Sequence, residues 1–138
     1  IAVQASLTGH LVFSTLHTPD VVQTCDRIVD VFPPHQQEQV RVQLAGAIEG
    51  VLSQRLIPST DGGRVMALEI LIATDAVRNQ IREGMTPQLI TTMEANGRLG
   101  MVTMDRSLTN LYQQGRITRE TALLYARKPD EMKRFLYR

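Results

Sequence analysis

Apolar positions change along the chain from an unbroken run to helical spacing and then to strict alternation. The unbroken run covers residues 11–16 and consists almost entirely of apolar and β-branched side chains. Such a run predicts a strand buried on both faces inside a parallel sheet. Residues 1–7 have the character of an amphipathic helix already under way, and the chain opens without Met, so we expect a fragment of a longer protein.

Two helices are predicted after this strand. The first covers residues 20–31, with Thr18 as its N-cap and Pro19 at its first helical position. Its apolar face is formed by Val21, Cys25, Ile28, Val29 and Phe32. Consecutive prolines at 33 and 34 end this helix and start the second, which we expect to cover residues 35–52.

Strict alternation then predicts a hairpin, with strands at 53–58 and 64–73 and a turn at 59–63 that contains Asp-Gly-Gly. Glu69 is the one polar residue on an otherwise apolar face of the return strand. We expect it to pair with Arg55 on the opposite strand, and a catalytic role is the less favoured interpretation.

Four short helices and a last amphipathic turn are predicted from residue 74 onward. Thr74 or Asp75, Thr103 or Asp105, and Thr118 are the candidate N-caps, and Thr86-Pro87 starts the remaining helix. The predicted fold is therefore of the α/β class. It has a strand, helix and hairpin part at 1–73 and a helical part at 74–138.

Composition narrows the function classes. The net charge of +1 gives no electrostatic argument for nucleic acid or a membrane as the main partner. A single cysteine, Cys25, excludes an internal disulfide framework or a multi-cysteine zinc site and fits a reducing cytoplasm. No apolar run reaches the roughly 20 residues that span a bilayer, and no signal peptide is evident.

Histidines stand at both ends of the first predicted strand. His17 follows the carboxyl end of that strand, where ligands bind in open α/β sheets, so it is placed at a candidate binding edge. The alternative for His10 and His17 is a structural role in which each bonds to backbone. A zinc site made from these two is not favoured, because a third ligand is missing from the pattern.

The segment around these histidines resembles a known motif. Residues 8–18, TGHLVFSTLHT, are similar to the histidine box of the secretion ATPases, the hexameric motors of type II secretion and type IV pili. Residues 26–33, 36–44, 53–56, 76–84 and 100–105 resemble the pilus-retraction branch of this family, the PilT-like twitching-motility ATPases. The resemblance covers essentially the whole chain.

The resemblance implies the second half of a RecA-like P-loop ATPase core followed by a C-terminal helical bundle. It also implies that the full-length protein binds ATP and Mg²⁺. No Gly-x-x-x-x-Gly-Lys-Ser/Thr loop occurs in these 138 residues, so this chain alone is not expected to hydrolyse ATP, and Mg²⁺ ligands are expected outside it.

Site residues follow from the same resemblance. His17 and His10 would contact the terminal phosphate or its water as catalytic residues. Gln54, Arg55 and Thr18 would line the nucleotide pocket, although Thr18 as a helix cap is the favoured alternative and Arg55 could pair with Glu69 instead. The set Arg78, Asn79 and Arg82 would form a retraction or partner surface, its alternative being an ordinary solvated helix face.

The motor expected from the resemblance is a hexamer that drives pilus retraction and twitching motility. It would be cytoplasmic, peripheral to the inner membrane, and would act on an inner-membrane pilus platform protein. The alternatives are a pilus assembly or type II secretion ATPase, or a non-catalytic module that joins a ring. The tight turn at 59–63, where many secretion-branch members carry a four-cysteine insert, favours the pilus branch. Val77 and Gln80, where that branch tends to have Ile and Leu, dilute the match.

Overall fold

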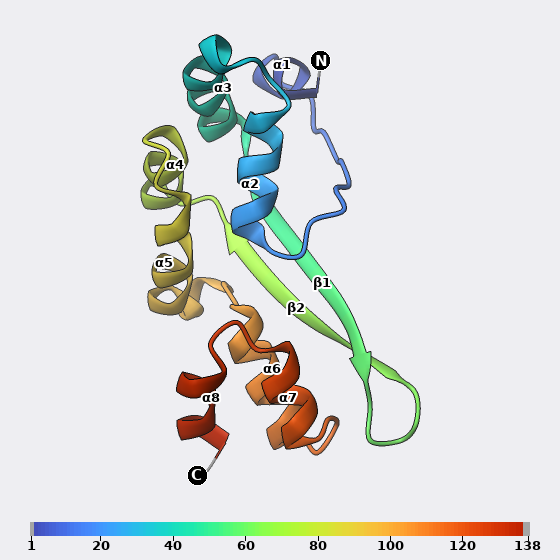
Figure 1. The fold of residues 1–138 in the computed structure, drawn as a ribbon. Helices are drawn as coiled ribbons and strands as arrows, with labels where there is room; N and C mark the ends of the chain where they lie inside the picture. The colour runs from blue at the N-terminus through green and yellow to red at the C-terminus, as the bar shows by residue number, and fades with distance from the viewer. Residues whose placement is uncertain (1, 137–138) are drawn as a thin grey trace.

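The computed structural model describes residues 2–136. Within these residues, helices pack against a single long antiparallel hairpin (Figure 1). In chain order the elements are α1 (Ala2–Leu7), α2 (Val21–Asp30), α3 (Pro34–Ala47), β1 (Gly50–Pro58), β2 (Arg64–Ile72), α4 (Asp75–Arg82), α5 (Leu89–Ala95), α6 (Met104–Gln113), α7 (Arg119–Tyr125) and α8 (Pro129–Leu136). Short 3₁₀ turns at Thr86–Gln88 and Gly97–Leu99 flank α5. No helix in the described part combines the length and apolar character needed to cross a bilayer.

The segment between α1 and α2 is extended but is not a strand. Residues 10–18 have no regular secondary structure, and Leu11 and Phe13 are 77% and 88% exposed. The strand predicted at 11–16, buried on both faces, is therefore absent from the described residues. A strand needs a neighbouring strand to satisfy its backbone N–H and C=O groups. Residues 11–16 have no such neighbour in the described structure, because β1 and β2 pair with each other and, at Ile70, with Val102. In Figure 1 the segment runs as an open trace from α1 to the start of α2.

The predicted hairpin is confirmed, with one correction at its start. β1 and β2 pair in register from Gly50 opposite Ile72 to Pro58 opposite Arg64. α3 ends at Ala47, so the prediction that helix continues to residue 52 is wrong. Ile48 already has extended backbone, and Gly50 approaches β2 so closely that a Cβ there would lie 3.0 Å from the carbonyl oxygen of Leu71.

The two faces of the hairpin differ in burial, as the alternation predicts. The inner face carries the buried side chains of Ser53, Ile57, Ala67, Glu69 and Leu71. The outer face leaves Leu52, Leu56 and Met66 exposed. Helices therefore cover only the inner face in the described part of the chain.

Two separate hydrophobic cores form along that inner face. Side chains of α2 to α5 pack with Leu71 into the first, which we call the α2–α5 core. Side chains of α6 to α8 pack with Ile57 and Ala67 into the second, the α6–α8 core. On β2, Glu69 stands between Ala67 of one core and Leu71 of the other, so a carboxylate occupies the junction.

The helix starts confirm most of the predicted caps. Threonine hydroxyls at 74, 103 and 118 accept backbone N–H bonds and cap α4, α6 and α7. The N-cap predicted at Thr18 is wrong, because Asp20 caps α2 by accepting from the Gln23 N–H at 2.8 Å. The Thr18 hydroxyl instead bonds to the Thr24 hydroxyl at 2.6 Å. Thr18 lies two residues before the cap, and from there its side chain reaches the first turns of α2.

Cys25 lies in the α2–α5 core and is 1% exposed. Burial, with a smaller contribution from the Asp26 carboxylate, raises the pKa of its thiol to about 12. We predict that a thiol reagent such as DTNB leaves Cys25 unmodified in the folded protein at about pH 8 and modifies it on unfolding. Absorbance at the thionitrobenzoate band measures the difference, and fast modification of the folded protein would contradict this packing.

Candidate functional site

The histidine-bearing segment is exposed along its length. The Nδ1 atom of His10 lies 3.2 Å from both the Ala5 carbonyl oxygen and the Thr8 hydroxyl, which ties this ring to the end of α1. His17 is exposed, and the hydrogen bonds of the described residues include none to its ring. The His17 ring therefore has both nitrogens available to a ligand, whereas Nδ1 of His10 is already engaged.

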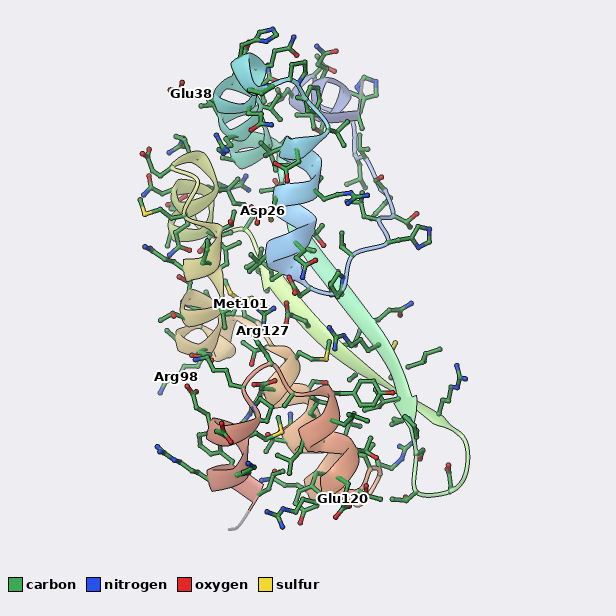
Figure 2. The ribbon with its side chains drawn as sticks, in the orientation of Figure 1. Asp26, Glu38, Arg98, Met101, Glu120 and Arg127 are labelled. Atoms are coloured by element: carbon green, nitrogen blue, oxygen red, sulfur yellow. The ribbon has the colours of Figure 1, made fainter. Side chains whose placement is uncertain are left out.

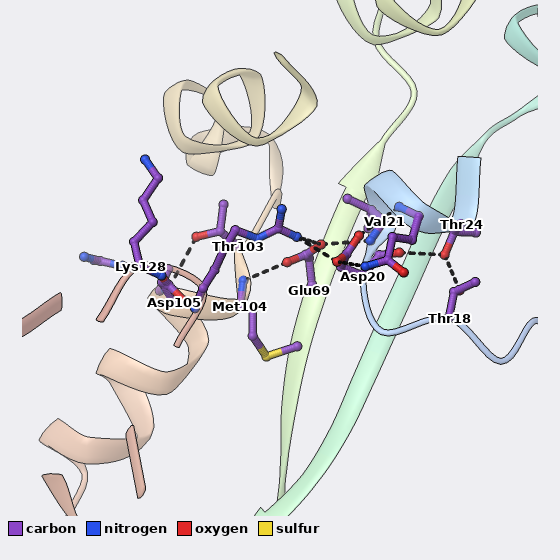
Figure 3. Close-up of polar contacts among 12 residues, drawn as sticks. Thr18, Asp20, Val21, Thr24, Glu69, Thr103, Met104, Asp105 and Lys128 are labelled. Carbon is purple, nitrogen blue, oxygen red and sulfur yellow. Dashed lines mark hydrogen bonds and ion pairs between the residues drawn. The ribbon is translucent and has the colours of Figure 1, made fainter. Parts of the chain in front are cut away.

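Behind His17 the chain is anchored to α2. Thr18 bonds to Thr24, the Thr24 hydroxyl also donates to the Asp20 carbonyl at 2.8 Å, and Asp20 caps the helix. These contacts hold the residues just after His17 against the first turns of α2 (Figure 3). The hydroxyl of Thr18 is thus engaged inside the protein.

Gln54 and Arg55 lie on opposite faces of β1. Gln54 is exposed on the outer face between Leu52 and Leu56, and Arg55 is half-buried on the inner face. No hydrogen bond or ion pair among the described residues joins either of them to His10 or His17. In the described structure these four predicted residues are therefore not brought together.

Glu69 does not pair with Arg55, so that prediction is wrong. Its neighbour across the hairpin is Ser53, and its side chain is fully buried. One carboxylate oxygen accepts from the Val21 N–H at 2.9 Å and the other from the Met104 N–H at 3.1 Å (Figure 3). Val21 and Met104 are the first residues of α2 and α6, so Glu69 satisfies one otherwise unpaired N–H at each of two helix starts.

Arg127 completes this cluster from the connection between α7 and α8. Its guanidinium lies 3.3 Å from an Asp20 carboxylate oxygen and 3.7 Å from Glu69. The Asp105 carboxylate accepts from the backbone N–H groups of Arg127 and Lys128 at 2.7 and 3.0 Å. We call Asp20, Glu69, Asp105 and Arg127 the junction cluster. The sequence offered one signal for it, the lone polar residue on the apolar face of β2.

The predicted partner surface on α4 divides into two parts. Arg78 donates to the carbonyl oxygens of Ala45 and Gly46 at 2.9 and 3.2 Å and pairs with Glu49 at 3.1 Å. It therefore holds the end of α3, where cations are favoured. Asn79 and Arg82 are exposed on α4 and remain available to a partner.

A groove of about 630 Å³ lies away from these predicted residues. Its lining includes Met93, Met101, Thr103, Arg106, Met132 and Phe135, and none of the predicted site residues is among the residues that line it. The described residues contain no group of three or more His, Cys, Asp or Glu side chains that could hold a metal ion.

Comparison with known proteins identifies the family. The family described as Type II/IV secretion system protein matches residues 1–133. The type IV pilus retractation ATPase PilT of Pseudomonas aeruginosa is 45% identical over 94% of this chain and 38% of its own length. A twitching motility protein of Neisseria gonorrhoeae is 47% identical over 96% of this chain and 36% of its own length.

Solved structures agree. A crystal structure of the pilus retraction motor PilT with bound ADP is 47% identical and superimposes with a TM-score of 0.85. The match covers 96% of this chain and 37% of that one. The ATPase DotB of Legionella pneumophila is 28% identical, with a TM-score of 0.74 over 88% of this chain and 33% of its own.

These matches confirm the predicted fold class, a section of a RecA-like ATPase core followed by helices. The chain spans little more than a third of the length of the relatives that it matches. It belongs to the family of type II/IV secretion system proteins.

Proposed function

We propose that the full-length protein is an ATP-hydrolysing motor that drives type IV pilus retraction. The observation that carries the proposal is the identity of 45–47% to PilT and a twitching motility protein across nearly the whole chain. Matches to type II secretion and pilus assembly ATPases reach only 41% of the chain. The retraction branch is therefore favoured over the assembly and secretion branch.

In this proposal His17 donates a hydrogen bond to the terminal phosphate of ATP or to the attacking water. Its exposed ring and its lack of a partner among the described residues fit that role. His10 would play a secondary part, because its Nδ1 is held by the end of α1. Gln54 on the outer face or Arg55 on the inner face would add a nucleotide contact, and the hydroxyl of Thr18 would position the segment.

Bound ATP would supply the free energy that moves one subunit against the next, and its Mg²⁺ would be held by residues outside this chain. The residues described here would position the contact to the phosphate and would transmit the movement between subunits to the α4 surface. We propose a cytoplasmic homo-hexamer, peripheral to the inner membrane, whose α4 surface at Asn79 and Arg82 meets the pilus platform protein. Domain boundaries at 1–73 and 74–138 remain part of this proposal.

Replacing His17 tests the catalytic role. In the full-length protein we predict that His17→Ala lowers kcat for Mg²⁺-dependent ATP hydrolysis at least about 10-fold, the loss expected for one good transition-state contact. A coupled assay of phosphate release measures it. His35→Ala, which removes an exposed histidine from α3, is the matched control and should hydrolyse normally.

Normal hydrolysis by His17→Ala would show that this histidine has a structural role and not a catalytic one. Absence of hydrolysis by the unmodified full-length protein would contradict the motor itself and favour the ring module.

The α4 surface is tested by separating its two arginines. We predict that Arg82→Ala keeps the stability and ATP hydrolysis of the full-length protein but reduces twitching motility in cells, because Arg82 is exposed. Arg78→Ala should instead lower the free energy of unfolding by about 1–2 kcal/mol, because carbonyls at the end of α3 lose a charged donor. Urea denaturation measures stability. Lys133→Ala is the control for motility, and a defect in Arg82→Ala no larger than the control's would show that Arg82 is not part of the partner surface.

A further inference from the structure

The junction cluster connects parts of the chain that are distant in sequence. Figure 2 shows Arg127 between the upper and lower groups of helices. Its guanidinium reaches Asp20 at the start of α2 and Glu69 on β2, and its side chain is 32% exposed. The contact therefore joins the connection between α7 and α8 to the segment that follows His17.

The position of Arg127 is itself fixed. Asp105, in the first turn of α6, accepts the backbone N–H groups of Arg127 and Lys128. The first residue of α6, Met104, donates to Glu69. The contacts thus form a closed circuit that runs from β2 through α6 to Arg127 and back to β2, so Arg127 is bonded to α6 through its backbone and to β2 through its side chain.

Asp20 links Arg127 to the segment that carries His17, because it contacts the Arg127 guanidinium and also caps α2. One of its oxygens caps α2 at the Gln23 N–H, and the other lies near the Gln23 side chain and Arg127. Asp20 comes three residues after His17, and Thr18 between them bonds to Thr24. The exposed stretch that ends at His17 is therefore fixed at one end by a residue that Arg127 holds.

The charges make this contact stronger than an ordinary surface pair. An exposed ion pair contributes little, because water and salt screen it. Here Glu69 is fully buried, and Asp20 has a side-chain exposure of 14%. Without the guanidinium, these two carboxylates would share the site with no cation between them, and their repulsion would act on the start of α2.

From this circuit we propose that Arg127 is a positioning residue for the phosphate contact of His17. It acts through Asp20, holding the start of α2 and the segment before it in one arrangement relative to the C-terminal helices. The proposal rests on the proposed function, because it assigns regulation of the same site. Its consequence is that a movement of α6 to α8 would reorient His17, and a movement of His17 would be felt by those helices.

The test uses the full-length protein. We expect Arg127→Ala to lower kcat for ATP hydrolysis about 3-fold to 10-fold, which lies within the range of coupling between residues in contact, and to leave KM for ATP within about 2-fold. Arg127→Lys, which keeps the cation, should recover part of the loss. Lys133→Ala is the matched control. Among the described residues Lys133 pairs only with Asp130 on its own helix, so its loss should change neither constant.

A double-mutant cycle adds a check on the route through Asp20. Asp20→Asn keeps a side-chain acceptor for the cap but removes the charge that Arg127 contacts. We expect Asp20→Asn combined with Arg127→Ala to be no slower than Arg127→Ala alone. Additive losses would overturn the route through Asp20.

Amide hydrogen exchange provides a readout that does not depend on activity. We expect faster exchange in residues 18–24 of Arg127→Ala and no change in Lys133→Ala. An unchanged kcat in Arg127→Ala would overturn the positioning role, even if the thermal midpoint fell. If the unmodified protein does not hydrolyse ATP, the proposed function fails, and unchanged exchange at 18–24 would then overturn the positioning role separately.

Discussion

The described structure depends on the burial of one carboxylate between two hydrophobic cores. Glu69 is fully buried, and its two oxygens accept one backbone N–H from the first residue of α2 and one from the first residue of α6. A buried carboxylate without partners would be strongly unfavourable, and so would two buried helix starts without acceptors. The two N–H groups satisfy the carboxylate, and the carboxylate satisfies the two N–H groups. The same side chain therefore fixes the positions of α2 and α6 relative to β2.

This arrangement makes the hairpin a packed connection between the two cores. Leu71 belongs to the α2–α5 core and Ala67 to the α6–α8 core, so one strand contributes to both. The hairpin turn is also held at its far end, where Thr60 donates its backbone N–H to the Arg116 carbonyl and its hydroxyl to the Gly115 carbonyl. A displacement at the start of α2 would therefore reach α6 to α8 through packed and hydrogen-bonded parts of the chain rather than through a loose linker.

The sequence predicted what local chemistry determines. Threonine caps at 74, 103 and 118 and the Asp-Gly-Gly turn depend on a few adjacent residues, and the structure confirms them. At the start of α2 the same reasoning chose Thr18, which was wrong: Asp20 caps the helix, and the Thr18 hydroxyl bonds to Thr24. The strand at 11–16 and the partners of Glu69 depend on segments far away in the chain, and alternation alone does not identify those partners. Of the predicted site residues, His17 is exposed with no hydrogen bond to its ring among residues 2–136, whereas Arg78 bonds to the end of α3.

Amide hydrogen exchange at Val21 and Met104, resolved by NMR in the unmodified protein and in Glu69→Gln, tests the role of Glu69 most directly. Glutamine keeps one acceptor oxygen and replaces the other by an amino group that can only donate. The account predicts slow exchange at both amides in the unmodified protein and exchange at least about 10-fold faster at one or both in Glu69→Gln. Fast exchange at both amides in the unmodified protein, or equal rates in the two proteins, would contradict the claim that Glu69 joins the two cores.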